Sequence, residues 1–234
     1  MSTPRRFYAA AAVTPEHGVS LDQRTLRTPG GTVFAAPNAA LAQAVAAEWG
    51  AQGEHIAPAS MPLTQLAFAA IDWTPKSRDK LINYVAAYAE TDLCCHRADS
   101  PAALVSRQSA HWDPLLAWAE AAHGIKLAAV TGIIAANIDP KMRERLVAHA
   151  KTLDDFSLTA LAQAAGLSGS ALIALAMLAR RLDAAGAFEA AALDNLWSLE
   201  RWGEDAEARA KLDRQRAEFE NIATFIEALG TDRP

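Results

Sequence analysis

The chain has 234 residues, of which 51% are hydrophobic and 21% are charged, and its formal net charge is −5. This composition excludes a globally disordered chain and supplies enough apolar material for a sizeable core. The negative charge argues against a nucleic acid as the main partner, because proteins that bind such polyanions present a basic face.

The first 37 residues are predicted to form short antiparallel strands. Val19, Leu21 and Leu26 lie among polar neighbours in a strand-like rhythm, and a turn is expected at 29–31, where a proline precedes two glycines. A further short β-leaning run at 32–34 ends before Pro37. The periodicity then becomes helical, with Asn38 as the expected N-cap of the first helix.

Helices account for the rest of the chain. A short helix should contain 63–70, and Ser77 should cap the next helix, over which the pattern continues to about 91. The pattern lapses at 92–100, so we expect an N-terminal domain at 1–97 and a C-terminal domain at 98–234. The second domain is predicted to be all-α, with helices near 101–111, 114–123, 140–153, 157–166, 170–184, 189–201 and 205–229.

Proline and glycine set the expected ends of several of these helices. Asp113-Pro114 and Asp139-Pro140 each place a capping acid before a proline at the first helical position. Gly124 and Gly166 stand where a helix should end. The predicted fold class is therefore α+β overall and mainly α, with a small α+β domain followed by a helical bundle.

No catalytic motif is recognisable, and the chain is predicted to be a non-enzyme without cofactor or metal. It lacks a phosphate-binding loop, a zinc-protease motif and a nucleophile elbow. Cys94, Cys95 and His96 are the one cluster of soft ligands, and adjacent cysteines cannot easily bind one tetrahedral zinc. An enzyme that uses this cluster, or His111 with Asp113, stays open as an alternative.

The stretch 157–182 raises a second alternative, a transcriptional regulator with a helix-turn-helix. Its two helices flank a glycine-containing turn, as in DNA readers of this type. The second helix, however, is apolar over 171–178, whereas a recognition helix must present polar and basic side chains to DNA. We therefore favour a buried helical hairpin and no nucleic-acid partner.

The compartment is predicted from two further features. The adjacent cysteines indicate a reducing environment without disulfides. The start of the chain lacks the leucine-rich run of a secretory signal, and the longest apolar stretch, 171–179, is about half of a membrane span. We expect a soluble, cytoplasmic protein that does not insert into membranes.

Six tryptophans are spread over both halves of the chain. Trp49, Trp112, Trp118 and Trp197 are predicted to be structural, each anchoring a helix in the core. Trp202 is different, because a helix break and an acidic stretch follow it. The acids suit a helix N-terminus, but an exposed aromatic and acidic rim is also the usual composition of a partner-binding surface. The sequence leaves both interpretations open.

Several runs, taken in order, carry a resemblance to a known family. They are 6–8 (RFY), 19–29 (VSLDQRTLRTP), 48–49 (EW) with Gln52 and Ile56, 61–64 (MPLT), 84–94, Gln108 with 112–114 (WDP) and Trp118, and Trp197 with 202–205 (WGED). This series, which spans almost the whole chain, resembles the assembly chaperone for the α subunit of F-type ATP synthase, found in mitochondria and α-proteobacteria. Gln23 departs from the family, which often has glycine in this hairpin turn.

The resemblance implies a fold, an activity and a partner. The fold would be a small α+β domain with a C-terminal orthogonal helical bundle. The activity would be to bind the free α subunit and to shield its interface with β until the α/β ring forms, without nucleotide hydrolysis. We expect a monomer in the bacterial cytoplasm, since the chain has no arginine-rich presequence, whereas eukaryotic relatives would act in the mitochondrial matrix.

The resemblance also implies a binding residue. The family's functional carboxylate lies a few residues before a Trp-Gly pair, and Asp194 is the nearest match in this sequence. As a hypothesis, we extend this site to a partner-binding rim. Its residues are Asp194, Glu200, Trp202, Glu204, Asp205 and Glu207.

Overall fold

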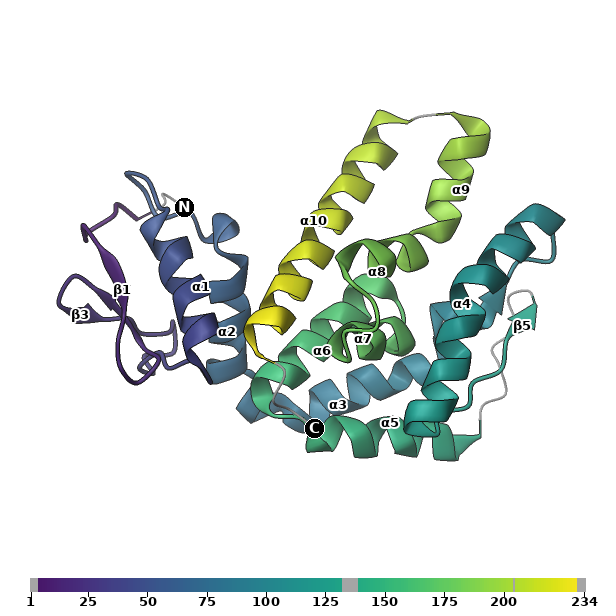
Figure 1. Ribbon diagram of the computed structural model, residues 1–234, viewed down its shortest axis with the longest axis horizontal. Helices are drawn as coiled ribbons and strands as arrows, with labels where there is room; N and C mark the ends of the chain where they lie inside the picture. Colours follow the sequence, from purple (N-terminus) through teal and green to yellow (C-terminus); the bar gives the residue numbers. More distant parts are fainter. Residues whose placement is uncertain (1–3, 132–138, 204, 231–234) are drawn as a thin grey trace. The chain divides into compact units, whose positions relative to one another are not determined.

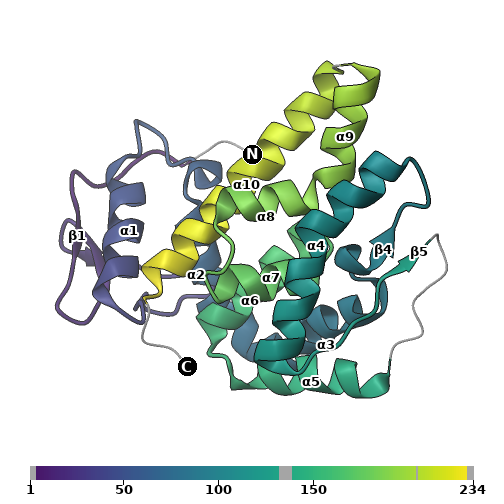
Figure 2. The same cartoon turned by 45° about the vertical axis from the view of Figure 1, so that its right-hand side comes forward.

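The computed structural model describes residues 4–131, 139–203 and 205–230 (Figures 1 and 2). The chain divides into two compact units. Unit 1 comprises 1–78 together with 154–160 and 224–234, and unit 2 comprises 79–153 and 161–223. Each unit thus gathers separate parts of the chain, and the division into 1–97 and 98–234 expected from the sequence stays a prediction.

Unit 1 begins with the expected antiparallel strands. Strands β1 (Ala11–Val13), β2 (Val19–Leu21) and β3 (Arg24–Thr25) form one sheet in the order β1-β2-β3. Val19 and Leu21 are buried, as their alternation with polar residues predicted. In the turn before β3, Asp22 adopts the left-handed conformation, with φ 53°. Gln23 is therefore tolerated where the family often has glycine.

Three helical segments complete most of unit 1. Helix α1 (Ala39–Gly50) begins at Asn38, whose Oδ1 accepts a hydrogen bond from the Leu41 N–H at 2.9 Å, which confirms the predicted cap. The 3₁₀ turn η1 (Pro58–Ser60) leads to α2 (Pro62–Asp72). Glu48 ties these helices together, because its carboxylate accepts from the backbone N–H groups of Leu63 and Thr64 at 2.8 and 2.7 Å.

Segments from later in the chain close unit 1. Helix α3 (Thr74–Thr91) begins before Ser77, the predicted cap, which lies inside the helix with non-helical backbone angles. The Thr74 and Thr159 hydroxyls lie 2.6 Å apart, and the Asn38 Nδ2 donates to the Leu229 carbonyl at 2.9 Å. The residues 154–160 and 224–230 therefore complete a core that the first 78 residues begin.

Unit 2 is mainly helical, and its core is the apolar helix α7 with its neighbours. The remaining elements of the chain are η2 (Leu93–Cys95), β4 (His96–Arg97), α4 (Ala102–His123), β5 (Val130–Thr131), α5 (Pro140–Thr152), α6 (Asp155–Ser168), α7 (Ala171–Leu178), α8 (Ala184–Ala191), α9 (Leu193–Trp202) and α10 (Ala206–Ala228). The start of α6 and the end of α10 belong to unit 1. Strands β4 and β5 pair in parallel beside α4, which the sequence did not predict (Figure 2). No helix in the described part of the chain has the length and apolarity needed to cross a membrane.

A buried carboxylate fixes the start of α7. Asp92 is fully buried, and it accepts hydrogen bonds from the Ser170 hydroxyl at 2.6 Å and the Leu172 N–H at 3.1 Å. The Cys94 N–H donates to the same carboxylate at 3.0 Å. Burial raises the pKa of Asp92, while these donors lower it. Asp92 therefore joins the end of α3 to the N-terminus of α7, where unpaired N–H groups need an acceptor.

The predicted break at Pro114 is wrong, because α4 continues through this proline. Asp113, expected to cap a new helix, instead forms an ion pair with the buried Arg97 guanidinium at 2.7 Å. Trp112, the residue before Asp113, is fully buried, and its Nε1 donates to the Ala190 carbonyl at 2.9 Å. Tertiary contacts on this stretch thus outweigh the loss of one helical hydrogen bond.

Three other predicted helix ends also differ. Gly166 lies inside α6, whose last turn is followed by Gly169 with φ 69°, whereas Gly124 ends α4 with φ 63° as predicted. The expected helix at 170–184 ends at Leu178. The expected helix at 189–201 is divided between α8 and α9 around Ala192, whose side chain is fully buried.

Candidate functional site

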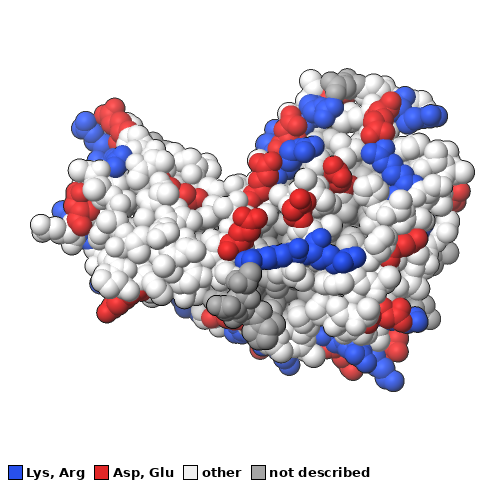
Figure 3. All heavy atoms as spheres, viewed as in Figure 1, with Lys and Arg blue, Asp and Glu red and all other residues white. Residues whose placement is uncertain are grey.

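Helix α9 carries the first part of the predicted rim. Leu193 at its start is buried, and Asp194 in its first turn suits the positive end of the helix dipole. The helix ends at Gly203, which has φ 94°. In Figure 3, acidic and basic side chains lie next to each other over α9, and acidic side chains form a row along α10. The surface is therefore of mixed charge.

Asp194 is exposed, and the structure places it against α4. Its Oδ1 accepts a hydrogen bond of 2.8 Å from the Nε2 of Gln108, a buried glutamine. This partner is a neutral amide, so the contact is a hydrogen bond and not an ion pair. Within the described residues, Asp194 forms no ion pair.

Glu200 is also exposed, but its charge is compensated. Both of its carboxylate oxygens accept from the Arg107 guanidinium of α4, at 2.6 and 2.9 Å. These hydrogen bonds lower the pKa of Glu200 and raise that of Arg107. Glu200 therefore joins α9 to α4, and it has less capacity than Asp194 to attract a new cation.

Trp202 is the most exposed large hydrophobic side chain of the described residues, with 87% of its surface accessible. Beyond Gly203, the carboxylate of Asp205 accepts the Glu207 N–H at 2.8 Å and so caps the start of α10. Glu207 is exposed in the first turn of α10. Glu204 lies outside the described residues.

The four tryptophans predicted to be structural differ in their burial. Trp49 and Trp112 are buried, whereas Trp118 and Trp197 are half-buried. The Arg107 and Arg201 guanidinium carbons each lie 5.9 Å from the centre of the Trp197 ring. Trp197 therefore packs beside charged residues of both α4 and α9, at the edge of the candidate site.

Comparisons with known proteins agree with this architecture. The profile of the ATP12 chaperone protein family matches residues 5–120. An aspartate-to-lysine mutant of Atp12p from Paracoccus denitrificans is 37% identical, with a TM-score of 0.92 over 98% of this chain and 100% of that chain. Atp12 from the same organism is also 37% identical, with a TM-score of 0.91 over 97% of this chain and 99% of that one.

A third structure is more distant. The Atu1473 protein of Agrobacterium tumefaciens is 33% identical, with a TM-score of 0.88 over 97% of this chain and 87% of that chain. The chain belongs to the ATP12 chaperone family. The resemblance inferred from the ordered sequence runs, and the mainly helical α+β fold that it implied, are thereby confirmed.

In this ATP12 family member, the cysteine cluster has no sign of reactivity. Cys94 and Cys95 are both buried and free. Burial, together with the nearby Asp92 carboxylate, raises the pKa of Cys95 to about 12 and that of Cys94 well above its usual value. Along the described ranges, no group of three or more His, Cys, Asp or Glu side chains is arranged to hold a metal.

The helix pair α6 and α7 is likewise unsuited to DNA recognition in this ATP12 family member. All residues of α7 from Ala171 to Met177 are buried. A helix without an exposed face cannot enter a DNA groove. Its role is to fill the core of unit 2, as its continuous apolar sequence predicted.

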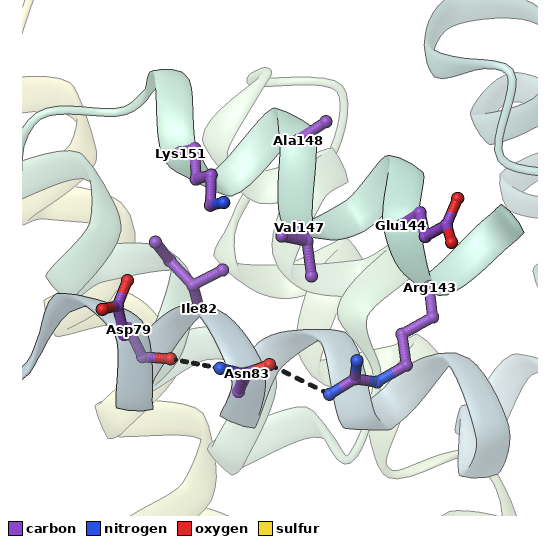
Figure 4. A pocket seen from close by; sticks show the side chains of 8 residues that line it. All are labelled: Asp79, Ile82, Asn83, Arg143, Glu144, Val147, Ala148 and Lys151. Carbon is purple, nitrogen blue, oxygen red and sulfur yellow. Dashed lines mark hydrogen bonds between the residues drawn. The ribbon is translucent and has the colours of Figure 1, made fainter. Parts of the chain in front are cut away.

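A groove between α3 and α5 is a feature that the sequence did not predict (Figure 4). Its volume is about 420 Å³, and its lining comprises Asp79, Ile82, Asn83, Arg143, Glu144, Val147, Ala148 and Lys151. Arg143 donates to the Asn83 side chain at 3.0 Å. Two acids and two bases line the groove, so its charge is balanced and favours neither an anionic nor a cationic ligand. None of the predicted rim residues takes part in it.

Proposed function

We propose that this ATP12 family member binds the free α subunit of the F-type ATP synthase and shields its β-facing interface until the α/β ring forms. The subunits of a ring expose apolar interfaces before assembly, and such surfaces aggregate. A binding protein that covers this interface and is displaced by β needs neither catalysis nor a cofactor. We place the protein in the bacterial cytoplasm as a monomer.

The observation that carries the proposal is the exposed Trp202 at the end of α9, in a chain of this family. Exposed tryptophans are costly to leave in water and are enriched among the residues that dominate binding energy. Asp194 on the same helix offers a carboxylate without a cationic partner among the described residues. Together they supply an apolar anchor and a charged contact for a protein partner.

The other residues of the proposed rim are expected to contribute less to binding than Asp194 and Trp202. Glu200 is held by Arg107, and Asp205 caps α10, so each is already engaged. Glu207 is exposed and adds to the negative potential. Glu204 remains in the proposed rim on the strength of the sequence alone.

Co-expression with the cognate α subunit, followed by size-exclusion chromatography of the soluble fraction, tests the proposal. We expect α to stay soluble and to co-elute with this chain near one-to-one. Asp194→Lys and Trp202→Ala should each abolish co-elution while the chaperone remains folded by circular dichroism. Equal aggregation of α with and without this chain would refute the proposal.

Matched controls separate the site from general surface changes. Asp213→Lys makes the same charge change at an exposed position of α10, and Trp73→Ala removes another exposed indole, in unit 1. Both controls should retain co-elution. If they lose it as completely as the rim variants, the interaction does not depend on the proposed site.

A further inference from the structure

Gln108 is a buried glutamine with only 1% of its surface exposed, and both ends of its amide are engaged. Its Oε1 accepts a hydrogen bond of 2.9 Å from the Ala98 N–H, just after β4. Its Nε2 donates to Asp194 Oδ1 at 2.8 Å. The side chain therefore connects the backbone after β4 to the carboxylate on α9.

These partners determine the orientation of the amide. The Ala98 backbone N–H can only donate, so it requires the oxygen end of Gln108. The NH₂ end must then face Asp194, whose carboxylate can only accept. A flipped amide would oppose donor to donor and acceptor to acceptor. The hydrogen bond from the Ala98 N–H thus fixes the orientation of the Gln108 amide.

The surrounding contacts hold α4 and α9 in register. Arg107, adjacent to Gln108 in α4, binds Glu200 with two hydrogen bonds two turns further along α9. Trp112, one turn after Gln108, is fully buried and donates to the Ala190 carbonyl shortly before α9. Gln108, which binds Asp194, therefore lies on α4 between two residues, Arg107 and Trp112, that also bind other parts of the chain.

The arrangement leaves half of the carboxylate available. Gln108 engages Oδ1, and Oδ2 has no hydrogen-bond or ion-pair partner in the described part of the chain. Because Arg107 is occupied by Glu200, no cation of the site neutralises Asp194. A carboxylate with one oxygen fixed and the other exposed is suited to a directed, charge-assisted bond with a cation.

We propose that Gln108 is the positioning residue that orients Asp194 toward a basic side chain, arginine or lysine, of the client protein. This inference rests on the proposed function, since the client is the α subunit. Gln108 does not contact the client. It restricts the Asp194 rotamer before binding, so that less conformational freedom is lost when the basic side chain arrives.

A double-mutant cycle on binding tests the inference. The dissociation constant for purified cognate α subunit is measured with the wild type, Gln108→Met, Asp194→Asn and the double variant. We expect Gln108→Met to weaken binding about tenfold when Asp194 is present, since a hydrogen bond to a charged group has such an effect. In the Asp194→Asn background, Gln108→Met should change the affinity by less than about twofold, because the oriented carboxylate is already absent.

A structural role alone would give a different pattern. If Gln108→Met weakens binding equally in both backgrounds, or has no effect in either, Gln108 does not act through Asp194 and the inference is overturned. Wild-type protein that fails to bind α overturns the proposed function, and this inference falls with it. Normal wild-type binding without coupling overturns only the inference.

Two further variants guard against a simple folding defect. Gln215→Met removes a glutamine of unit 2 whose Nε2 donates to the Leu167 carbonyl at 3.2 Å, and it should leave affinity unchanged. Gln108→Glu retains an acceptor for the Ala98 N–H but opposes Asp194 with a second carboxylate. It should weaken binding in the wild-type background and have little effect beside Asp194→Asn, so it replaces Gln108→Met if that variant does not fold.

Discussion

Two buried tryptophans should respond very differently to the same substitution by phenylalanine. The Nε1 of Trp112 donates to the Ala190 carbonyl at 2.9 Å, whereas the Nε1 of Trp49 is buried without a hydrogen-bond partner among the described residues. Both substitutions remove similar ring volume. Trp112→Phe also removes a buried hydrogen bond, which costs about 1–3 kcal/mol, while Trp49→Phe removes an unsatisfied donor.

We therefore expect the free energy of unfolding to fall by about 1–3 kcal/mol more for Trp112→Phe than for Trp49→Phe. Urea denaturation followed by far-ultraviolet circular dichroism measures the global effect. Hydrogen exchange at the amides of α4 and α1 assigns it to unit 2 or unit 1. Equal losses, or a larger loss for Trp49→Phe, would refute the hydrogen-bond reasoning.

Substitution of Trp49 by alanine tests separately whether its ring stabilises the core of unit 1. Trp49 packs against Tyr8 with ring centres 5.8 Å apart, and the Tyr8 hydroxyl donates to the Trp49 carbonyl at 2.8 Å. Trp49→Ala should reduce the free energy of unfolding by about 3–5 kcal/mol. A loss below about 1 kcal/mol would show that this ring does not anchor the core of unit 1.

Three further predictions concern charge, pH and backbone. Glu200→Gln should leave the urea denaturation midpoint almost unchanged, because the ion pair of Glu200 with Arg107 is on the surface; a clear shift to lower urea concentration would indicate a buried role. Burial lowers the pKa of His123 and His149, so unfolding takes up protons in acid and the melting temperature should fall as the pH drops below about 6.5. His149→Phe should flatten this pH profile, and an unchanged profile would contradict the assignment. Gly166→Ala should destabilise the fold, because the added Cβ would lie 2.7 Å from the Tyr84 hydroxyl. In a Tyr84→Phe background the same change should be neutral or stabilising, since alanine favours the helix more than glycine does. Thermal denaturation of the wild type, the two single variants and the double variant tests both expectations.

Features that depend on neighbouring residues could be predicted from the sequence. The cap at Asn38 and the left-handed helix end at Gly124 are local, since each follows from a side chain or backbone preference within one turn. The alternation of Val19 and Leu21 similarly predicted a half-buried strand. These preferences act over a few residues and leave a readable pattern.

Features that depend on distant residues could not be predicted in this way. Strands β4 and β5 have two residues each, too few for a periodic signal. A glycine such as Gly166 locally indicates a helix end, whereas the Tyr84 side chain that lies against it is far away in the sequence. Likewise, the ion pair with Arg97 that occupies Asp113 is invisible to local preference.

The candidate site also contains both kinds of feature, some that the sequence could predict and one that it could not. Residue types and the family resemblance pointed to Asp194 and Trp202, and the exposure of both is compatible with their proposed role. Gln108 appeared in the sequence runs without any assigned role. The local sequence around a glutamine inside a helix does not indicate a partner 86 residues away. Only the three-dimensional structure could therefore reveal the hydrogen bond from Gln108 to Asp194.

The hydrogen bond between Asn38 and the Leu229 carbonyl has a consequence for biosynthesis. It spans 191 residues, and its segment at 224–230 is part of the same compact unit as the first 78 residues. Because a chain leaves the ribosome with its N-terminus first, unit 1 cannot close before residues 224–230 have been translated. A premature stop codon after residue 223 would therefore damage the fold of the first 78 residues, although these are translated first.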